Sequence, residues 1–139
     1  MSNHEFFQKY LDRIGEVLYS CEFSNLYTAS KIFADTKSTR SKVILAGNGG
    51  SAAMASHVAV DLTKTAGIRA VNFNEADLLT CLANDFGYEN WIARALDYYA
   101  DPGDVVVLIS SSGESTNILE GAKKARELGL TLLTFLFFL

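Results

Sequence analysis

The hydrophobic residues of the first forty positions follow a helical pattern. Ser2 and Glu5 have the spacing of a capping box, and apolar residues then recur every three or four positions. A second apolar stripe predicts a helix over about 23–37. We therefore expect a helical N-terminal hairpin over residues 1–38. Its wide apolar stripe could cover a sheet or pack against another subunit, and the pattern does not decide which.

The pattern changes after Lys42, where short and continuous apolar runs alternate with helical stretches. Residues 43–46 form a continuous apolar run that is typical of a strand buried on both faces, and further candidate strands lie at 70–73, 105–109 and 131–135. Strands that alternate with helices predict parallel pairing through right-handed crossovers. We therefore expect one domain over 1–139, with an α/β core over 42–139. The core should be a doubly wound parallel sheet of flavodoxin-like order 2-1-3-4.

Two loops of unusual composition follow the first and third predicted strands. Residues 47–51 read Gly-Asn-Gly-Gly-Ser, and residues 110–115 read Ser-Ser-Ser-Gly-Glu-Ser. In the common 2-1-3-4-5 order these strands flank the switch point, so both loops should face one crevice. Backbone amides and hydroxyls at two helix starts could then hold a phosphate. The alternative, two ordinary turns with serine caps, is less favoured for the two loops together than for either alone.

Composition narrows the choice of partner. The formal net charge is −4, and no basic run occurs, which argues against nucleic acid or an anionic membrane as a partner. Hydrophobic residues make up 49% and charged residues 20%, an ordinary globular balance. No segment has the roughly 17–25 apolar residues of a membrane span. The two cysteines form no CxxC pair and are expected to be buried. We therefore expect a soluble cytoplasmic protein.

A dinucleotide site is the rival for the first loop. Gly47-x-Gly49-x-x-Ala52 matches the G-x-G-x-x-G/A fingerprint, and Glu75 lies where a ribose-binding acid could sit. That motif is weak alone and gives no role to the serine loop. The P-loop motif G-x-x-x-x-G-K-[ST] is absent from the sequence. We therefore expect no nucleotide cofactor.

Two further polar pairs are candidates for chemistry. His57 and Asp61 are four residues apart on the helix after the first loop, a spacing that suits two metal ligands or an acid–base pair. The same spacing also suits an ordinary solvated helix face. Asn84 and Asp85 form a polar cluster that we expect in a turn, where helix capping is the simpler interpretation.

Three motifs together resemble the SIS (sugar isomerase) domain, and within it the phosphoheptose isomerases. They are the glycine loop at 47–51, Ala-Asn-Asp-Phe-Gly-Tyr at 83–88 and Ile-Ser-Ser-Ser-Gly-Glu-Ser at 109–115. The resemblance implies conversion of sedoheptulose 7-phosphate to D-glycero-D-manno-heptose 7-phosphate. It also implies a homotetramer and zinc bound by His57 and Asp61, with Asp61 as the acid–base residue. The implied substrate-binding residues are Asn48, Gly49, Gly50, Ser51, Asn84, Asp85, Ser110, Ser111, Ser112 and Ser115.

The sequence departs from the family pattern in two places. The family usually carries Glu where this chain has Asp61, one methylene shorter. The family also continues into a fifth strand and a last helix that bears a glutamine and a histidine, whereas this sequence ends in Leu-Phe-Phe-Leu. We therefore expect an SIS domain that is incomplete at its C-terminus. The alternative function is a non-catalytic sugar-phosphate sensor or regulator.

Overall fold

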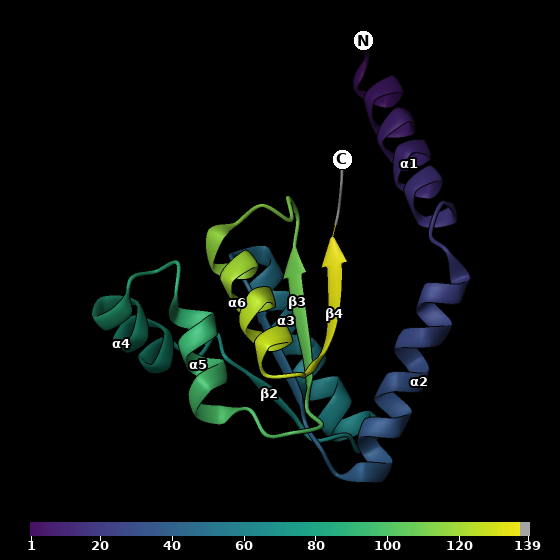
Figure 1. Ribbon diagram of the computed structural model, residues 1–139. Helices are drawn as coiled ribbons and strands as arrows, with labels where there is room; N and C mark the ends of the chain where they lie inside the picture. The colour runs from purple at the N-terminus through teal and green to yellow at the C-terminus, as the bar shows by residue number, and fades with distance from the viewer. Residues whose placement is uncertain (137–139) are drawn as a thin grey trace. The chain divides into compact units, whose positions relative to one another are not determined.

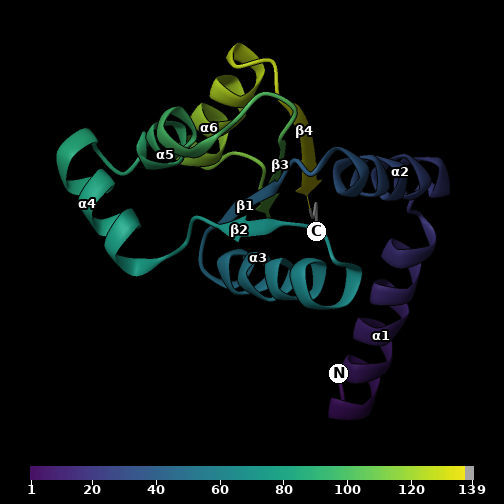
Figure 2. The same ribbon diagram turned by 90° about the horizontal axis from the view of Figure 1, so that it is seen from below.

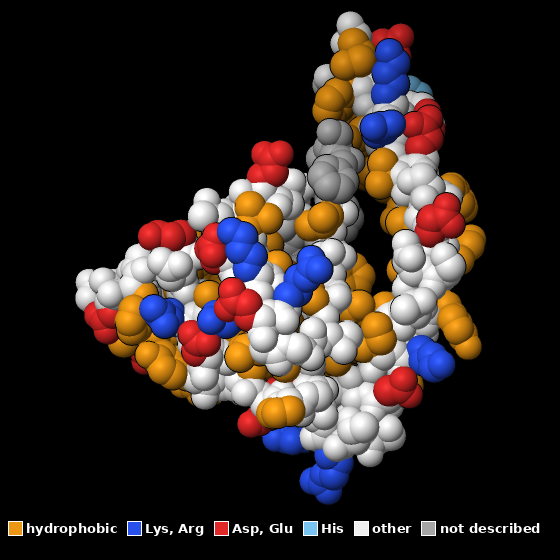
Figure 3. Space-filling view, viewed as in Figure 1, with side chains coloured by type: hydrophobic (Ala, Val, Ile, Leu, Met, Phe, Trp, Pro, Cys, Tyr) orange, Lys and Arg blue, Asp and Glu red, His pale blue; other side chains and the backbone are white. Residues whose placement is uncertain are grey.

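The computed structural model describes residues 1–136 and divides the chain into two compact units, Met1–Ser30 and Lys31–Leu139. The first unit holds α1 (Asn3–Tyr19) and the beginning of α2 (Phe23–Thr39). The predicted capping box is present: Glu5 N–H donates to Ser2 Oγ at 3.2 Å, and Ser2 N–H donates to the Glu5 carboxylate at 2.8 Å. No residue of α1 is buried, and apolar side chains lie along the helix surface (Figure 3).

The second unit is built on a four-stranded parallel sheet of order β2-β1-β3-β4. The strands are β1 (Val43–Gly47), β2 (Ala70–Asn72), β3 (Val105–Ser110) and β4 (Thr131–Leu136). The connecting elements are α3 (Gly50–Asp61), the π-helix η1 (Leu62–Ala66), α4 (Ala76–Phe86), α5 (Trp91–Tyr99) and α6 (Thr116–Glu127). The predicted fold class and strand order are confirmed.

Alternate residues of the two central strands pack on opposite faces of the sheet. Ile44 and Leu108 belong to a core with α4, α5 and α6. Leu45 and Val107 belong to a second core with α3 and with the part of α2 that follows Lys31. Figures 1 and 2 show α3 on one side of the sheet and α5 with α6 on the other. Helices therefore cover both faces, as a doubly wound sheet requires.

One glycine sets the distance between α5 and α6. A Cβ on Gly121 would lie 2.5 Å from Ile92 Cγ2, well inside van der Waals contact. Ile92 is fully buried and cannot turn away. The missing side chain therefore lets the two helices approach closely above the sheet.

A buried carboxylate organises the amino ends of β1 and β3. Asp104 accepts hydrogen bonds from the backbone N–H groups of Lys42 at 2.9 Å and Asp101 at 2.8 Å. The Lys42 ammonium pairs with Asp104 and, at 2.6 Å, with Asp101. Burial opposes the charge on Lys42, yet the two carboxylates outweigh it and raise the pKa of Lys42. The hydrogen bond and charge of Lys42 lower the pKa of Asp101.

The structure corrects two sequence-based expectations. Asn84 and Asp85 do not lie in a turn but in the last turn of α4, which ends before Gly87 at φ 84°. Gly87, with its positive φ, ends the helix, and it lies farther along the chain than the helix end that Asn84 and Asp85 suggested. Cys21 and Cys81 are both exposed rather than buried: Cys21 lies in the link between α1 and α2, and Cys81 lies in α4. Within residues 1–136, no helix has the length and apolar content that a bilayer crossing requires.

Candidate functional site

The glycine loop begins at Gly47, the last residue of β1, and its backbone is hydrogen-bonded by one asparagine that follows β2. Gly47 N–H donates to Asn74 Oδ1 at 3.0 Å, and Asn74 Nδ2 donates back to Gly47 O at 2.7 Å. A Cβ on Gly47 would lie 2.7 Å from the Ser51 carbonyl carbon, so the start of α3 comes too close for any side chain. Gly49 adopts φ 54° and ψ −120°, a conformation that favours glycine. The backbone of this loop is therefore fixed in position.

The side chain of Asn48 ties the two loops together. Asn48 Nδ2 donates to Asn117 Oδ1 at 2.9 Å, and Asn117 Nδ2 donates to Asn48 Oδ1 at 2.8 Å. The Tyr88 hydroxyl donates to the same Asn48 oxygen at 3.0 Å. Asn117 is buried in the first turn of α6, directly after the serine loop. The reciprocal pair therefore joins the loop after β1 to the helix that follows the loop after β3.

The serine loop uses two of its four hydroxyls to hold its own backbone. Ser110, buried at the end of β3, accepts from Gly113 N–H at 3.0 Å. Ser112 Oγ accepts from Glu114 N–H at 3.2 Å. Ser111 is exposed, and the hydroxyl of Ser115, the N-cap of α6, makes no capping hydrogen bond. Each accepting hydroxyl keeps its own proton for donation to a ligand.

Both loops end at helix starts that have no side-chain cap. Gly49 precedes α3 and Ser115 precedes α6, and neither supplies a capping bond. By contrast, Glu75 accepts from two N–H groups at the start of α4. The first N–H groups of a helix have no partner within the helix, and its dipole favours negative charge there. The site therefore offers amides and hydroxyls to an anion, and neither loop contains lysine or arginine.

His57 and Asp61 lie farther along α3. His57 Nε2 lies 3.5 Å from Asp61 Oδ2, and both side chains are exposed. At 1.5 Å per residue, His57 is about 10 Å and Asp61 about 16 Å along the helix axis from Gly50. His57 also borders an apolar hollow of about 320 Å³ that includes Ile109, the residue before the serine loop. Of the two side chains, His57 therefore lies nearer the glycine loop along α3.

Asn84 and Asp85 stand apart from the two loops in the hydrogen-bond network. Asn84 Nδ2 donates to Asp85 Oδ1 at 2.9 Å, and the Cys81 thiol lies 3.9 Å from Asp85 Oδ2. Among the described residues these bonds stay within α4, and the segment reaches the glycine loop only through Tyr88. Glu75, the acid of the dinucleotide alternative, is engaged as the cap of α4.

Sequence reasoning missed the three side chains that shape the glycine loop, namely Asn74, Tyr88 and Asn117. Two of them left a detectable signal. Asn74 follows the second strand, at the sheet edge where the loops were expected, and Asn117 comes two residues after the serine loop. Neither position reveals its partner, because the contacts span 27 and 69 residues of sequence.

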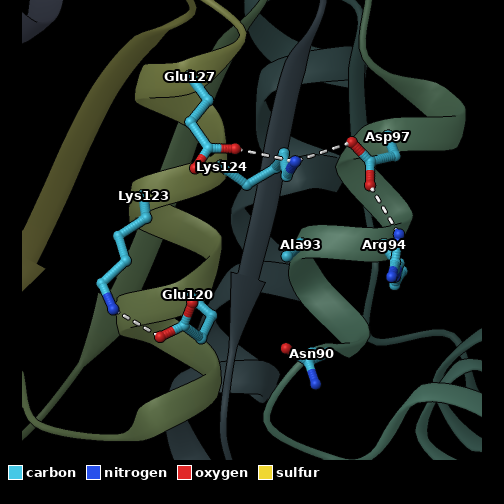
Figure 4. Close-up of a pocket in the computed structure, with 8 residues that line it drawn as sticks. All are labelled: Asn90, Ala93, Arg94, Asp97, Glu120, Lys123, Lys124 and Glu127. Atoms are coloured by element: carbon cyan, nitrogen blue, oxygen red, sulfur yellow. Dashed lines mark hydrogen bonds and ion pairs between the residues drawn. The ribbon is translucent and has the colours of Figure 1, made fainter.

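A second polar groove, between α5 and α6, has a different character. It encloses about 220 Å³ and is lined by three cations and three carboxylates (Figure 4). Lys124 pairs with Glu127 at 2.9 Å and Asp97 at 3.3 Å, and these two carboxylates raise the pKa of Lys124. Because its charges balance within the groove, we do not regard it as a ligand site.

Comparisons with known proteins agree with this geometry. The model of the SIS domain family matches residues 5–136. A phosphoheptose isomerase of Aliarcobacter butzleri is 39% identical over 110 residues, which are 75% of this chain and 58% of that protein. A phosphoheptose isomerase of Mycobacterium tuberculosis is 45% identical over 98 residues, which are 66% of this chain and 50% of that protein. The chain thus spans about half the length of these relatives.

A solved structure gives the same result. The phosphoheptose isomerase from Neisseria gonorrhoeae superposes with a TM-score of 0.85 at 27% identity, covering 96% of this chain and 72% of that one. The family match includes both loops and the sheet that positions them. This chain belongs to the SIS domain family, and within it is similar to the phosphoheptose isomerases.

Proposed function

We propose that this chain binds a phosphorylated sugar between the loops after β1 and β3 and contributes to a phosphoheptose isomerase. The observation that carries the proposal is the reciprocal Asn48–Asn117 pair, which holds two anion-binding helix starts at one edge of the sheet. The names of the relatives and of the solved structure support the substrate class.

The serine loop is the proposed phosphate-binding half of the site. Ser111, Ser112 and Ser115 can each donate a hydroxyl proton. The first backbone N–H groups of α6 lie at the N-terminal end of the helix, where the helix dipole is positive and favours an anion. A hydrogen bond to a charged partner contributes roughly 1.5–3 kcal/mol. Four such bonds are enough to anchor a small phosphate ester in an acidic protein without a lysine.

The glycine loop is the proposed sugar-binding half. Gly49 and Gly50 expose their backbone, because an added Cβ at either position would meet no atom within 4 Å. Sugar hydroxyls could therefore approach the backbone of these residues and the hydroxyl of Ser51. Asn84 and Asp85 would contact the sugar from α4, to which Tyr88 provides the structural link.

The proposed reaction is an aldose–ketose isomerisation through an enediol. A base removes a proton from C1 of sedoheptulose 7-phosphate, and the C2 carbonyl oxygen takes up a proton to give the enediol. A proton is then returned to C2, and the hydroxyl proton on O1 is lost as the C1 aldehyde forms. The product is the aldose, and no net proton is gained or lost. Asp61 is the proposed acid–base group, with His57 beside it at 3.5 Å.

Zinc is proposed at His57 and Asp61, which give only part of its ligand set. A catalytic zinc site takes three protein ligands. Among residues 1–136, no group of three or more His, Cys, Asp or Glu side chains is arranged to hold a metal ion. His57 and Asp61 supply two ligands, so the described residues do not form a complete site, and we derive no step through a metal.

Binding can be tested by calorimetry with sedoheptulose 7-phosphate. We expect one site per chain, no measurable binding of sedoheptulose itself, and loss of binding in the S110A/S111A/S112A variant. Ser38→Ala is the matched control, because Ser38 is an exposed serine of α2 that bonds only to Asp35 O. If the triple variant binds as well as the parent chain, the serine loop is not the phosphate site.

Turnover is tested separately, by release of tritium from C1 of the labelled ketose into water. Release that is lost in Asp61→Asn supports the enzyme. Binding without release supports the non-catalytic sensor. We also propose a cytoplasmic homotetramer, supported by the exposed apolar face of α1, and light scattering of the purified chain gives its mass.

A further inference from the structure

A second hollow lies at the opposite edge of the sheet from the two loops. It encloses about 250 Å³ and is lined by Thr36, Lys37, Arg40, Ser41, Gly67 and Arg69. These residues come from the last turn of α2 and from the segments that lead into β1 and β2, so the hollow lies toward the amino ends of these strands. Five strand residues at about 3.3 Å each separate this edge from the glycine loop by roughly 17 Å.

The hollow collects positive charge in an acidic chain. Three of its six lining residues are cations, Lys37, Arg40 and Arg69, and none is a carboxylate. None of the three forms an ion pair with a described residue, whereas Lys42, close by in sequence, pairs with two carboxylates. The charge of Arg69 also lowers the pKa of Asp101, after the larger effect of Lys42. Among the described residues, the three cations therefore have no carboxylate within ion-pair distance.

Most of their hydrogen-bond donors remain available. Lys37 Nζ donates to Ala66 O at 2.7 Å, and Arg69 Nη1 donates to Arg40 O at 2.7 Å. These two bonds cap the carbonyl ends of η1 and α2, and they explain why Lys37 and Arg69 are there. They leave two Lys37 protons and several guanidinium protons of Arg69 free. The side chain of Arg40 makes no hydrogen bond within residues 1–136 and has no such structural role.

Arg40 also has an unfavourable backbone. Its φ of 60° makes it the one non-glycine residue with positive φ in the described chain. It follows the end of α2, a position where glycine is the usual residue because a Cβ is strained there. Arginine at this position keeps a guanidinium at the hollow at the expense of local stability.

We propose that this hollow binds the phosphoryl group of a small metabolite, at a site separate from the crevice between the two loops. Three cations match the charge of a phosphoryl group, close to −2, better than the single charge of a carboxylate. The planar forks of Arg40 and Arg69 suit its oxygens. The volume equals that of about eight waters at roughly 30 Å³ each, enough for a phosphoryl group and part of its carrier.

Two sources would present this group, a sugar phosphate that also uses the crevice and a nucleoside diphosphate. The test measures binding of pyrophosphate and of sedoheptulose 7-phosphate by calorimetry in the S110A/S111A/S112A background. This background removes the proposed substrate site, so the two proposals fail independently. We expect one remaining site that weakens as salt is raised. Tighter binding of pyrophosphate identifies a nucleotide, and tighter binding of the sugar phosphate identifies the substrate or product.

Arg40→Gly separates a binding role from a structural one. Glycine relieves the positive φ, so we expect a higher melting temperature together with at least a tenfold loss of affinity for the phosphoryl probe. Arg126→Gln removes an equal charge from α6, outside the hollow, and should change affinity less than twofold. Unchanged binding in Arg40→Gly, no binding in the serine-variant background, or equal affinity for acetate would each overturn the proposal.

Discussion

The amide pair between Asn48 and Asn117 gives the sharpest prediction. Asn117→Ala removes two hydrogen bonds of 2.8 and 2.9 Å. Each contributes about 0.5–1.5 kcal/mol, and the half-buried Asn48 Nδ2 then loses its partner, which costs about 1–3 kcal/mol more. We expect a total loss of about 2–6 kcal/mol. With a urea m-value of about 2 kcal/mol/M, the unfolding midpoint should fall by about 1–3 M.

The assay is urea unfolding of four proteins: the parent, Asn48→Ala, Asn117→Ala and the double variant. Because both substitutions break the same pair, the double variant should cost less than the sum of the single ones, with a coupling of about 1–2 kcal/mol. Asn25→Ala is the control, since Asn25 is an exposed helical asparagine whose side chain makes no hydrogen bond within residues 1–136. Additive losses would show that the pair does not join the loops in solution.

Three further predictions concern the core and its charges. Gly121→Ala should destabilise by about 1–2 kcal/mol in urea, because overpacking against Ile92 outweighs the better helix propensity, and the loss should vanish in an Ile92→Ala background. Asp104→Asn should lower the unfolding free energy by about 2–4 kcal/mol at pH 7, since it leaves the Lys42 ammonium short of a partner; equal stability would contradict the buried pair. Asp101→Asn should reduce the decrease in unfolding free energy that the parent chain shows at acid pH. The pKa of Asp101 lies below its usual 3.8 in the folded chain, so the ionised carboxylate contributes stability that is lost as the pH falls below about 4. Unfolding curves from pH 7 to pH 3 check this, and an unaltered decrease counts against it.

The sheet could be predicted because its signals are local. The strand-forming runs are short, and the first three are followed directly by glycine, asparagine or serine, so strand order followed from general topology rules. The end of α4 could not be placed, because Asn84 and Asp85 are usual in turns, whereas here the helix continues through them to Phe86 and stops at Gly87. The predicted burial of the two cysteines was wrong, because residue type indicates only how often a side chain is buried on average.

The candidate site divides in the same way. The two loops and their common edge followed from the sequence, since each loop is tied to the end of its own strand. The side chains that fix Asn48 did not follow, because Tyr88 and Asn117 reach it from 40 and 69 residues away. Contacts of that range depend on the packed sheet and have no local pattern.

The long sequence distance between Asn48 and Asn117 has a consequence for the order of events. The glycine loop and the serine loop come together only after β1 and β3 have paired, so a fragment that contains one loop lacks half of the proposed ligand site. Ligand binding would then stabilise the pairing of two strands rather than one loop, because a bound state that uses both loops requires the neighbouring strands β1 and β3 to be in register. With ligand bound, backbone amide protons should consequently exchange more slowly with solvent along the whole length of β1 and β3, including the strand ends that lie far from the two loops.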